Sequence, residues 1–450
     1  MLLFAALLIF PPEVAQRLVG GALSSGVAYA RLAELSDTIG PRLSGSPGAE
    51  AAVKWALQKF QQDGLKARLE PVKVPHWVRG EERGEILPAS YAVGHPLALT
   101  ALGGSVGGDV TAEVIEARSL SDVTESARGK IVFFNHTMGK KGGYGDFVEM
   151  RTKGPSAAAR FGASGVLLRS LATLSLRSPH TGTTTYEADA PKIPAAAISV
   201  EDAELIDRLL QRGAVKVHFT LGCRWLPDAD SANVVADVRG RELPGEVVLL
   251  GAHLDSWDLA TGATDDGAGV AIVMEAGRLI AKEHPRRTVR IVLYMNEENG
   301  LAGGKAYAAA HEAELPRHVA ALESDSGAGR PVEVIVRAGD SGAGMLRPWL
   351  TALESLGVSG ISDGDASGAD ISTLGPFSVP MVAIHQDGTH YFETHHSAAD
   401  TLDKVEPEAL AKSAAAVALV AYALAEMPQP LPRPAPTEPK RPEPPKPPAH

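Results

Sequence analysis

The chain has 450 residues, 44% of them hydrophobic, so it is long enough for roughly two to three domains with an ample core. Its formal net charge of -11 disfavours nucleic acid and anionic lipid as partners. The single cysteine, Cys223, excludes an intrachain disulfide but not export, because a core of this size needs no disulfide.

The chain begins with an apolar run of signal-peptide length. Residues 1–10 are too few to span a bilayer as a helix, and no basic residue precedes them. We therefore expect no stable membrane insertion, and a possible signal or leader segment over residues 1–20 that would direct the protein to secretion or the periplasm. The alternative is an amphipathic helix that continues into the fold.

The region between residues 102 and 227 has a different sequence pattern from the segments before and after it. A helix is expected before it, over residues 47–64, from apolar residues at helical spacing. Between residues 102 and 227, short β-like runs alternate with Gly-rich loops and two short helices. The runs are 110–115, 130–134, 165–168, 195–199 and 215–220, and the helices are 154–161 and 200–210. We predict a module inserted at 102–227 into a catalytic domain formed by residues 21–101 and 228–427.

Long strands alternate with helices from residue 228 onward, which indicates an α/β sheet. Polar residues of metal-ligand type follow the strand-like runs 246–250, 288–295 and 318–322, and a further pair is expected near the end of the last strand. These residues are His253, Asp255, Asp265, Asp266, Glu297, Glu298, Glu323, Asp325, His395 and His396. Because such strands end at one edge of a sheet, the sequence predicts a metal site there.

Three local patterns support this prediction. His253 and Asp255 lie on the same side of an extended backbone, so the Asp255 carboxylate is suited to hold the imidazole of a metal-bound histidine. One carboxylate of the Asp265–Asp266 pair can cap the helix expected over 266–283, but capping does not explain both. Two adjacent glutamates after a buried strand repel each other unless cations or water are near.

These residues resemble peptidase family M28, a family of co-catalytic zinc exopeptidases. The likeness rests on segments 251–258, 265–266, 296–298, 323–325 and 395–401, and it runs from about residue 30 to 425. The inserted module resembles a protease-associated domain at 178–182, 191–194 and 200–204. The resemblance implies a mixed, mostly parallel sheet flanked by helices, with an inserted β-rich protease-associated domain, and a homodimer.

The resemblance also implies two zinc ions per subunit. Asp265 would bridge them, His253 and Asp325 would complete one site, and Glu298 and His396 the other. Glu297 would be the general base, Asp255 would support His253, and His395 would line the substrate pocket. His396 is preferred as the ligand because the family places its ligand four residues before an acidic residue and a threonine, here Asp400 and Thr401.

Two departures from the family pattern stand out. The turn expected before the last strand reads Ser367-Gly368-Ala369-Asp370, which leaves Asp370 a supporting role. Residues 428–450 are rich in proline, have no counterpart in the family pattern, and are expected to form an extended, disordered tail.

Hydrolysis of dipeptides or short peptides with free termini is the expected activity. The first alternative is an M28 aminopeptidase that acts on longer peptides, which the metal ligands cannot distinguish. A glutaminyl-cyclase-like acyltransferase would have a single-zinc site, and an inactive binding module would have lost a ligand or the base. The complete set of five ligands with Glu297 argues against these last two.

Overall fold

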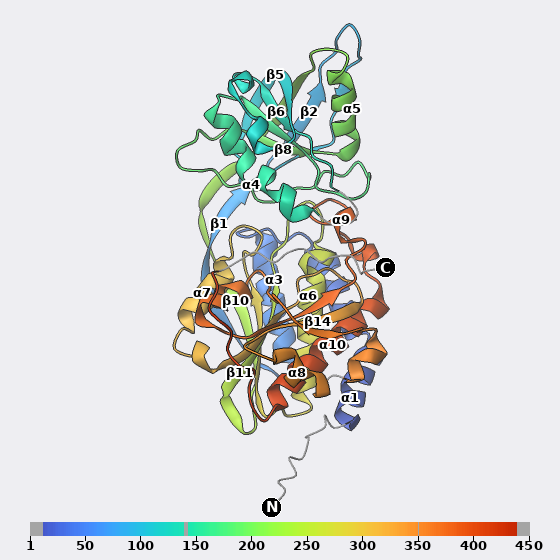
Figure 1. Cartoon of the computed structure of the whole chain (residues 1–450), viewed down its shortest axis with the longest axis vertical. Coiled ribbons are helices and arrows are strands. Elements are labelled where there is room, and N and C mark those ends of the chain that lie inside the picture. Colours follow the sequence, from blue (N-terminus) through green and yellow to red (C-terminus); the bar gives the residue numbers. More distant parts are fainter. Residues whose placement is uncertain (1–11, 139–142, 350, 439–450) are drawn as a thin grey trace, which may run out of the picture.

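Two sheet-based units stand one above the other (Figure 1). The computed structural model describes residues 12–138, 143–349 and 351–438. Strands from both sides of the middle region form the lower sheet, and the middle region alone forms the upper sheet. The α/β fold with an inserted β-rich unit, as the sequence predicts, is therefore observed.

The lower sheet has eight strands of mixed direction. Their order is β1 (Lys66–Val78), β10 (Arg224–Val238), β12 (Arg287–Tyr294), β11 (Leu243–His253), β13 (His318–Glu323), β16 (Met381–Gln386), β14 (Pro331–Arg337) and β15 (Ile361–Asp363). The central strands β12, β11, β13 and β16 are parallel to one another, and β1, β10 and β14 pair antiparallel. All residues of β12 are buried, its two arginines included.

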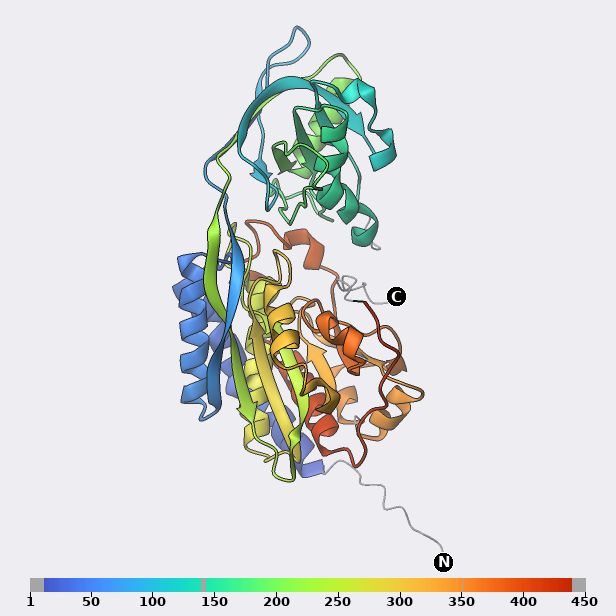
Figure 2. The same ribbon diagram turned by 90° about the vertical axis from the view of Figure 1, so that its left-hand side faces the viewer.

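Helices cover both faces of this sheet (Figure 2). One face carries the largest core, built from α1 (Pro12–Ser25), α2 (Val27–Glu34), α3 (Pro47–Gln62), α6 (Ala268–Ala281) and α10 (Pro407–Glu426). The other face packs against α7 (Ala302–Ala310) and the turn η8 (Ile371–Phe377). The helix expected over 47–64 is α3, whose start is fixed by Pro47 and by Ser46, which accepts a hydrogen bond from Ala49 N at 3.2 Å.

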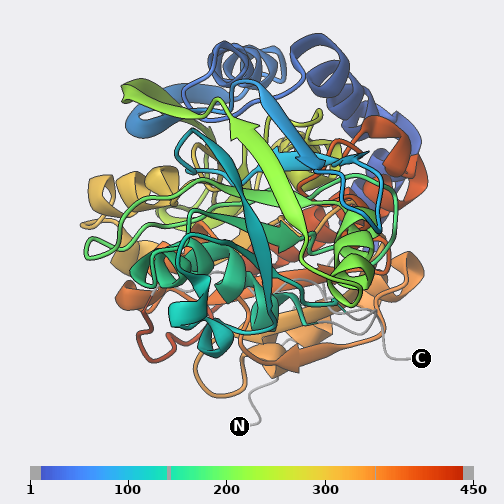
Figure 3. The ribbon, with the colours of Figure 1, turned by 90° about the horizontal axis from the view of Figure 1, so that it is seen from above.

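The upper unit is a second eight-stranded sheet with its own core. Its order is β3 (His95–Pro96), β2 (Glu82–Ile86), β9 (Lys216–Leu221), β5 (Gly108–Ala117), β6 (Ile131–Phe134), β7 (Gly165–Arg169), β8 (Ala195–Ile198) and β4 (Leu99–Ala101). Helices α4 (Tyr144–Arg160) and α5 (Val200–Leu210) pack on it. Seen from above, this unit lies over the upper end of the lower unit (Figure 3).

The insert begins earlier than the predicted boundary at residue 102. Strands β2, β3 and β4 already belong to the upper sheet, so the insert runs from about residue 79 to about 223. β2 is made of charged residues and Gly with one apolar residue at its end, and β3 and β4 have only two and three residues, so they carry no strand pattern of their own. Helix α4 also starts ten residues before the predicted 154, because Gly154 and Pro155 suggest a helix start but lie inside the helix.

The described part of the N-terminal segment is a helix of the fold. Val14, Ala15, Leu18 and Ala22 of α1 enter the main core, so residues 12–20 of the expected leader are part of the packed structure. This matches the amphipathic-helix alternative for those residues. Residues 1–11 of the expected leader lie outside the described residues.

The start of the Pro-rich tail is ordered, which corrects the expectation of disorder for residues 428–438. Leu431 is 3% exposed and joins the main core. Arg433 donates hydrogen bonds to four backbone carbonyls, those of Leu315, Pro316, His318 and Phe377. The tail has no helical or strand periodicity, but Leu431, Arg433 and hydrogen bonds with the backbone of Pro432, Ala435 and Thr437 attach it to the lower unit. The remainder, 439–450, lies outside the described residues.

Among the helices of the described ranges, α10 has the length and apolar composition that would allow a helix to cross a membrane. Most of its residues are buried in the main core against α6 and α1. A central helix that is apolar on all sides has this same composition.

Candidate metal centre

Four segments bring the predicted site residues to one edge of the lower sheet. β11 ends at His253, β12 is followed by Asn296 and the two glutamates, and β13 is followed by Asp325. These strands are parallel neighbours, so their carboxyl ends meet. The last pair differs from the prediction, because β16 ends at Gln386. His395 and His396 instead follow the short helix α9 (Tyr391–Thr394).

Asp265 lies at the centre of this edge, in the turn η4 (Ala263–Gly267). Its Oδ1 is 3.1 Å from Nε2 of His253. Its Oδ2 is 3.1 Å from Nε2 of His396 and 3.5 Å from Nε2 of His395. One carboxylate with its two oxygens facing two separate histidine groups is suited to bridge two cations.

The first ligand group is formed by His253, Asp265 and Asp325. Nε2 of His253 is 3.7 Å from Oδ1 of Asp325, and one donor atom from each of the three residues lies within 4.8 Å of the others. His253 is fully buried. Two carboxylates and one imidazole form a donor set that zinc accepts.

The second group contains a choice between two histidines. His395, His396 and Asp265 also place donor atoms within 4.8 Å of one another. The two imidazole rings stack with centroids 3.5 Å apart. His396 has the additional contact with the predicted ligand Glu298, 3.1 Å from Nε2 to Oε2. This contact favours the register chosen from the sequence, and the ligand roles stay predictions.

The buried carboxylates of this edge fit a cation site. Glu298 is 3% exposed, and its Oε1 has no hydrogen-bond partner among the described residues. Burial raises the pKa of Glu298, because the carboxylate has lost its water. A divalent cation would supply the missing partner and stabilise the carboxylate. The residues present therefore fit metal ions.

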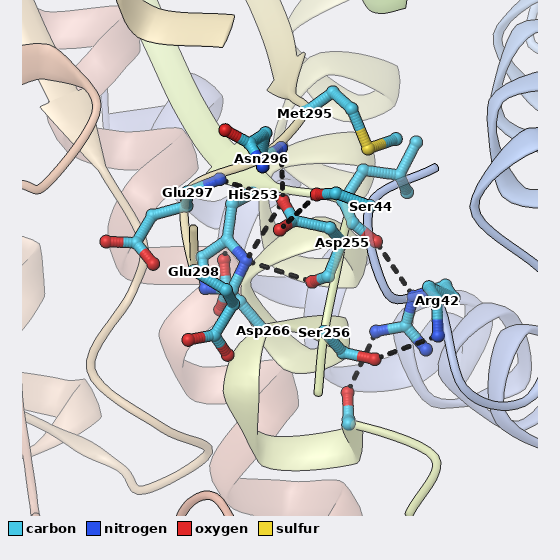
Figure 4. Close-up of polar contacts among 12 residues, drawn as sticks. Arg42, Ser44, His253, Asp255, Ser256, Asp266, Met295, Asn296, Glu297 and Glu298 are labelled. Carbon is cyan, nitrogen blue, oxygen red and sulfur yellow. Dashed lines mark hydrogen bonds and ion pairs between the residues drawn. The ribbon is translucent and has the colours of Figure 1, made fainter. Parts of the chain in front are cut away.

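Asp255 supports His253 in a different way from the one predicted. Nδ1 of His253 lies 3.0 Å from the backbone oxygen of Asp255, whereas the carboxylate Oδ1 is 3.8 Å away. That carboxylate instead accepts hydrogen bonds from the backbone N–H groups of Asn296 at 2.7 Å and Glu297 at 3.0 Å, and from Ser44 Oγ at 3.1 Å (Figure 4). Asp255 thus fixes both the imidazole and the turn that carries the predicted base.

Asp265 and Asp266 have different roles: one caps the helix α6 and the other faces the histidines, a choice that the sequence left open. Asp266 accepts from Gly269 N at 3.0 Å, at the start of α6, and from His253 N at 3.1 Å. Its pKa is raised by burial. Asp266 is therefore the capping carboxylate, and Asp265 is the one that faces the histidines.

Asp400 holds the turn that presents Asp265. Its carboxylate accepts from Thr264 N at 2.7 Å and from Asp265 N at 3.1 Å. Burial raises the pKa of Asp400 to about 6. The sequence used this residue only to choose between two histidines, and its supporting role depends on a contact across the fold.

Arg42 is a buried cation behind the site that the sequence reading missed. It is fully buried, and its guanidinium donates to the backbone oxygens of Gly40, Leu254, Thr261 and Gly262 (Figure 4). Burial lowers its pKa to about 10, so it stays protonated at neutral pH. Its position in the loop before α3 gives no local signal, since three of its four partners are more than 200 residues away in the chain.

Glu297 stands at the open side of the cluster. It is 8% exposed, and its side chain points away from Asp255 (Figure 4). Behind it, Asp370 accepts from Gly304 N at 3.0 Å, while Glu323 accepts from the backbone N–H groups of Asp370 and Ile371 at 3.2 and 2.8 Å. Burial raises the pKa of Glu323 to about 7. Asp370 therefore lies behind Glu297 and holds the backbone of Gly304, a place that suits the supporting role expected from the sequence.

The insert contributes backbone contacts to the same site. Thr181 N donates to the backbone oxygen of His396 at 2.9 Å, and the Thr183 hydroxyl donates to the backbone oxygen of Glu298. A small cavity reaches the cluster from the side of Trp257, whose ring packs in the insert's core. The site is thus bounded by both units.

Comparisons with known proteins agree with this geometry. Residues 233–421 match the model of peptidase family M28. Carboxypeptidase Q of Mus musculus and of Homo sapiens are each 39% identical over 403 residues, which cover 87% of this chain and 84% of those proteins. The chain belongs to peptidase family M28. The family predicted from the sequence is confirmed, and the protein is a peptidase.

Solved structures extend the likeness to the fold. The crystal structure of a peptidase M28 precursor from Shewanella amazonensis SB2B superposes with a TM-score of 0.91 at 41% identity, covering 95% of this chain and 99% of that one. A zinc aminopeptidase from Bacillus subtilis, at 20% identity, has a TM-score of 0.67 over 90% of this chain and 96% of that one. This second likeness shows the fold alone.

Proposed function

We propose that this M28 peptidase is a di-zinc exopeptidase that hydrolyses dipeptides or short peptides with free termini. The observation that carries the proposal is the position of Asp265, whose two oxygens face His253 on one side and His396 on the other. The 39% identity to carboxypeptidase Q over most of the chain supports it. The likeness of the second fold relative, described as a zinc aminopeptidase, supports zinc as the metal.

The chain's own residues would share the chemistry as follows. His253, Asp265 and Asp325 would hold one zinc, and Asp265, Glu298 and His396 the other. When bound, a zinc pair acidifies water and polarises a carbonyl group. Glu297 would take the proton of the attacking water and pass it to the leaving amine. Asp255 holds the backbone of Glu297, which keeps the base at a fixed place.

An M28 aminopeptidase that acts on longer peptides is the second candidate. It shares the metal site, so substrates must decide. Zinc-loaded protein would be assayed on unblocked dipeptides, N-blocked dipeptides, tetrapeptides and aminoacyl chromogens. Cleavage of unblocked dipeptides alone supports the first candidate. Equal or faster cleavage of tetrapeptides and chromogens supports the second, and no cleavage of any peptide overturns both.

Further expectations accompany this proposal. We infer that the insert is a protease-associated domain, that the protein forms a homodimer, and that it is exported to the periplasm or secreted. The apolar run at residues 1–10 supports export. Cell fractionation tests the location and light scattering of purified protein tests the dimer; cytoplasmic retention or a monomeric mass would contradict them.

A further inference from the structure

Arg151 of the insert is a buried cation with no anionic partner among the described side chains. It lies on α4 and is 2% exposed. Its Nη1 donates to the Tyr144 hydroxyl at 2.6 Å, and its guanidinium carbon lies 5.4 Å from the centre of that ring. Its Nε has no hydrogen-bond partner, and among the side chains that the structure describes no carboxylate forms an ion pair with it. An isolated buried charge is costly unless a partner arrives.

The other buried arginines show how this protein normally treats such a group. Arg42 has four backbone carbonyl acceptors. Arg79, also in the insert, pairs with Asp258 at 2.6 Å and with Glu82 at 3.1 Å. Among the described residues, Arg151 has one neutral hydroxyl as its acceptor. The contrast indicates a guanidinium kept for a ligand that comes and goes, since a permanent structural role would call for permanent acceptors.

The position of Arg151 places it beside the candidate metal centre. Tyr144, whose hydroxyl accepts the hydrogen bond of Arg151, also meets the ring of His395 edge-on, with ring centroids 5.4 Å apart. Gly182 packs directly on the guanidinium, and a Cβ on this residue would lie 2.2 Å from Nη1. Both neighbours of Gly182 in the sequence donate to the backbone of the predicted metal ligands, as described above. One loop therefore separates the cation from the metal ligands.

We propose that Arg151 binds the free α-carboxylate of a short peptide substrate, and so determines that substrates end one or two residues beyond the scissile bond. This proposal rests on the proposed function of the metal centre. A guanidinium presents parallel donors that match the two oxygens of a carboxylate.

Charge separates the two ends of the site. The sheet edge carries the acidic residues Asp265, Glu298, Asp325 and Glu297, whereas the facing part of the insert carries Arg151. The acids would hold the metal ions, whereas Arg151 would attract a substrate carboxylate. An extended residue spans about 3.3–3.6 Å, so a carboxylate anchored next to His395 leaves room for few residues after the scissile bond.

The test compares each peptide with its C-terminal amide. Zinc-loaded wild-type protein, Arg151→Met and the matched control Lys153→Met are assayed on Ala-Ala and Ala-Ala-amide. Lys153 lies on the same helix, is exposed, and pairs with Glu149, so its loss removes a cation of α4 away from the site. We expect kcat/KM on Ala-Ala to fall roughly 10- to 100-fold in Arg151→Met, with little change on the amide. Lys153→Met should behave as wild type on both.

Binding gives a readout that does not depend on turnover. In a Glu297→Gln background, calorimetry should detect Ala-Ala binding that is lost on Arg151→Met and weakened on Arg151→Lys, which keeps the charge but not the paired donors. Wild-type protein that cleaves the amide as fast as the free acid overturns the carboxylate role while leaving the metal centre intact. Equal losses on both substrates show a structural role for Arg151. Failure of wild type on every peptide contradicts the proposed function instead.

Discussion

The lower and upper units meet at the same site but contribute to it by different means. The lower sheet supplies side chains at the ends of parallel strands, with His253, Asp265 and Glu298 buried and fixed by neighbours such as Asp255. The insert supplies a backbone N–H and a hydroxyl group from the loop at 181 and 183. It also supplies the rings of Tyr144, at the start of α4, and His180, whose centroids lie 5.4 and 6.5 Å from that of His395. The difference suggests that the lower unit provides the chemistry and the insert limits what can reach it.

The largest effect should come from the lower unit. Glu297→Gln keeps the size of the side chain but cannot accept a proton, so activity should fall about 10²–10⁴-fold with folding and zinc content nearly unchanged. Glu312→Gln, at an exposed position of the same unit, is the matched control. Steady-state kinetics with metal analysis measure both. Full turnover of Glu297→Gln with zinc bound would show that Glu297 is not the general base.

The two histidines offer a sharper test within that unit. His396→Ala should lower bound zinc by about one ion per chain, because the contact of His396 with Glu298 places it in the second ligand group. His395→Ala should keep the metal and change kcat or KM. Metal analysis of the two purified variants decides the matter. The reverse pattern would show that the register is one residue off.

Removing the insert tests directly whether it limits which substrates reach the site. Val78 pairs with Arg224, so a short Gly/Ser linker can replace residues 79–223 without moving the strands. We expect both zinc ions to stay bound, while KM rises or longer peptides become substrates. Trp77 and Trp257 lose their packing in this variant, so Trp257→Gln in the full chain serves as a control for that loss. Wild-type kinetics on every peptide length would mean that the insert has no part in selection.

The smallest effect concerns stability of the lower unit alone. Truncation after residue 427 should lower the melting temperature by roughly 2–4 °C, because Leu431 leaves the core and four carbonyls lose Arg433. Truncation after residue 438 is the control and should change nothing, as its composition predicts. Thermal melts of the two truncated proteins compare them. Identical curves would contradict a role for the ordered part of the tail.

The sequence predicted the parts of the molecule whose signals are local. Apolar runs marked β11, β12 and β13, and the polar residues after them marked the site edge. Asp255 shows the limit of this approach. Its spacing from His253 suggested a direct carboxylate contact, but the carboxylate accepts hydrogen bonds from backbone N–H groups in the turn after β12.

Residues that act through long-range contacts gave no signal. Arg42 and Arg151 are single arginines in unremarkable segments, and only burial distinguishes them from surface charges. The predicted boundary of the insert was wrong for a related reason. β2 and β4 pair with the distant strands β9 and β8, and β3 pairs with β2, so their strand structure depends on partners rather than on a local pattern. The tail was misjudged because one arginine can satisfy several carbonyls without any periodic pattern.

The ribbon formed by β1 and β10 determines where the molecule can bend. From Arg224 to Asn233, β10 pairs with β1 alone, and from Val234 onward it is also bound to β12. Two strands resist bending out of their plane far less than a full sheet does, so a swing of the insert would pivot near residue 233. Asn233 sits at this pivot with its side chain bonded to Met295 N at 3.0 Å and to Gly303 O at 2.9 Å. The pivot is thus hydrogen-bonded to the segment that leads to the two glutamates. A tilt of the upper unit would therefore first displace the turn that carries Glu297.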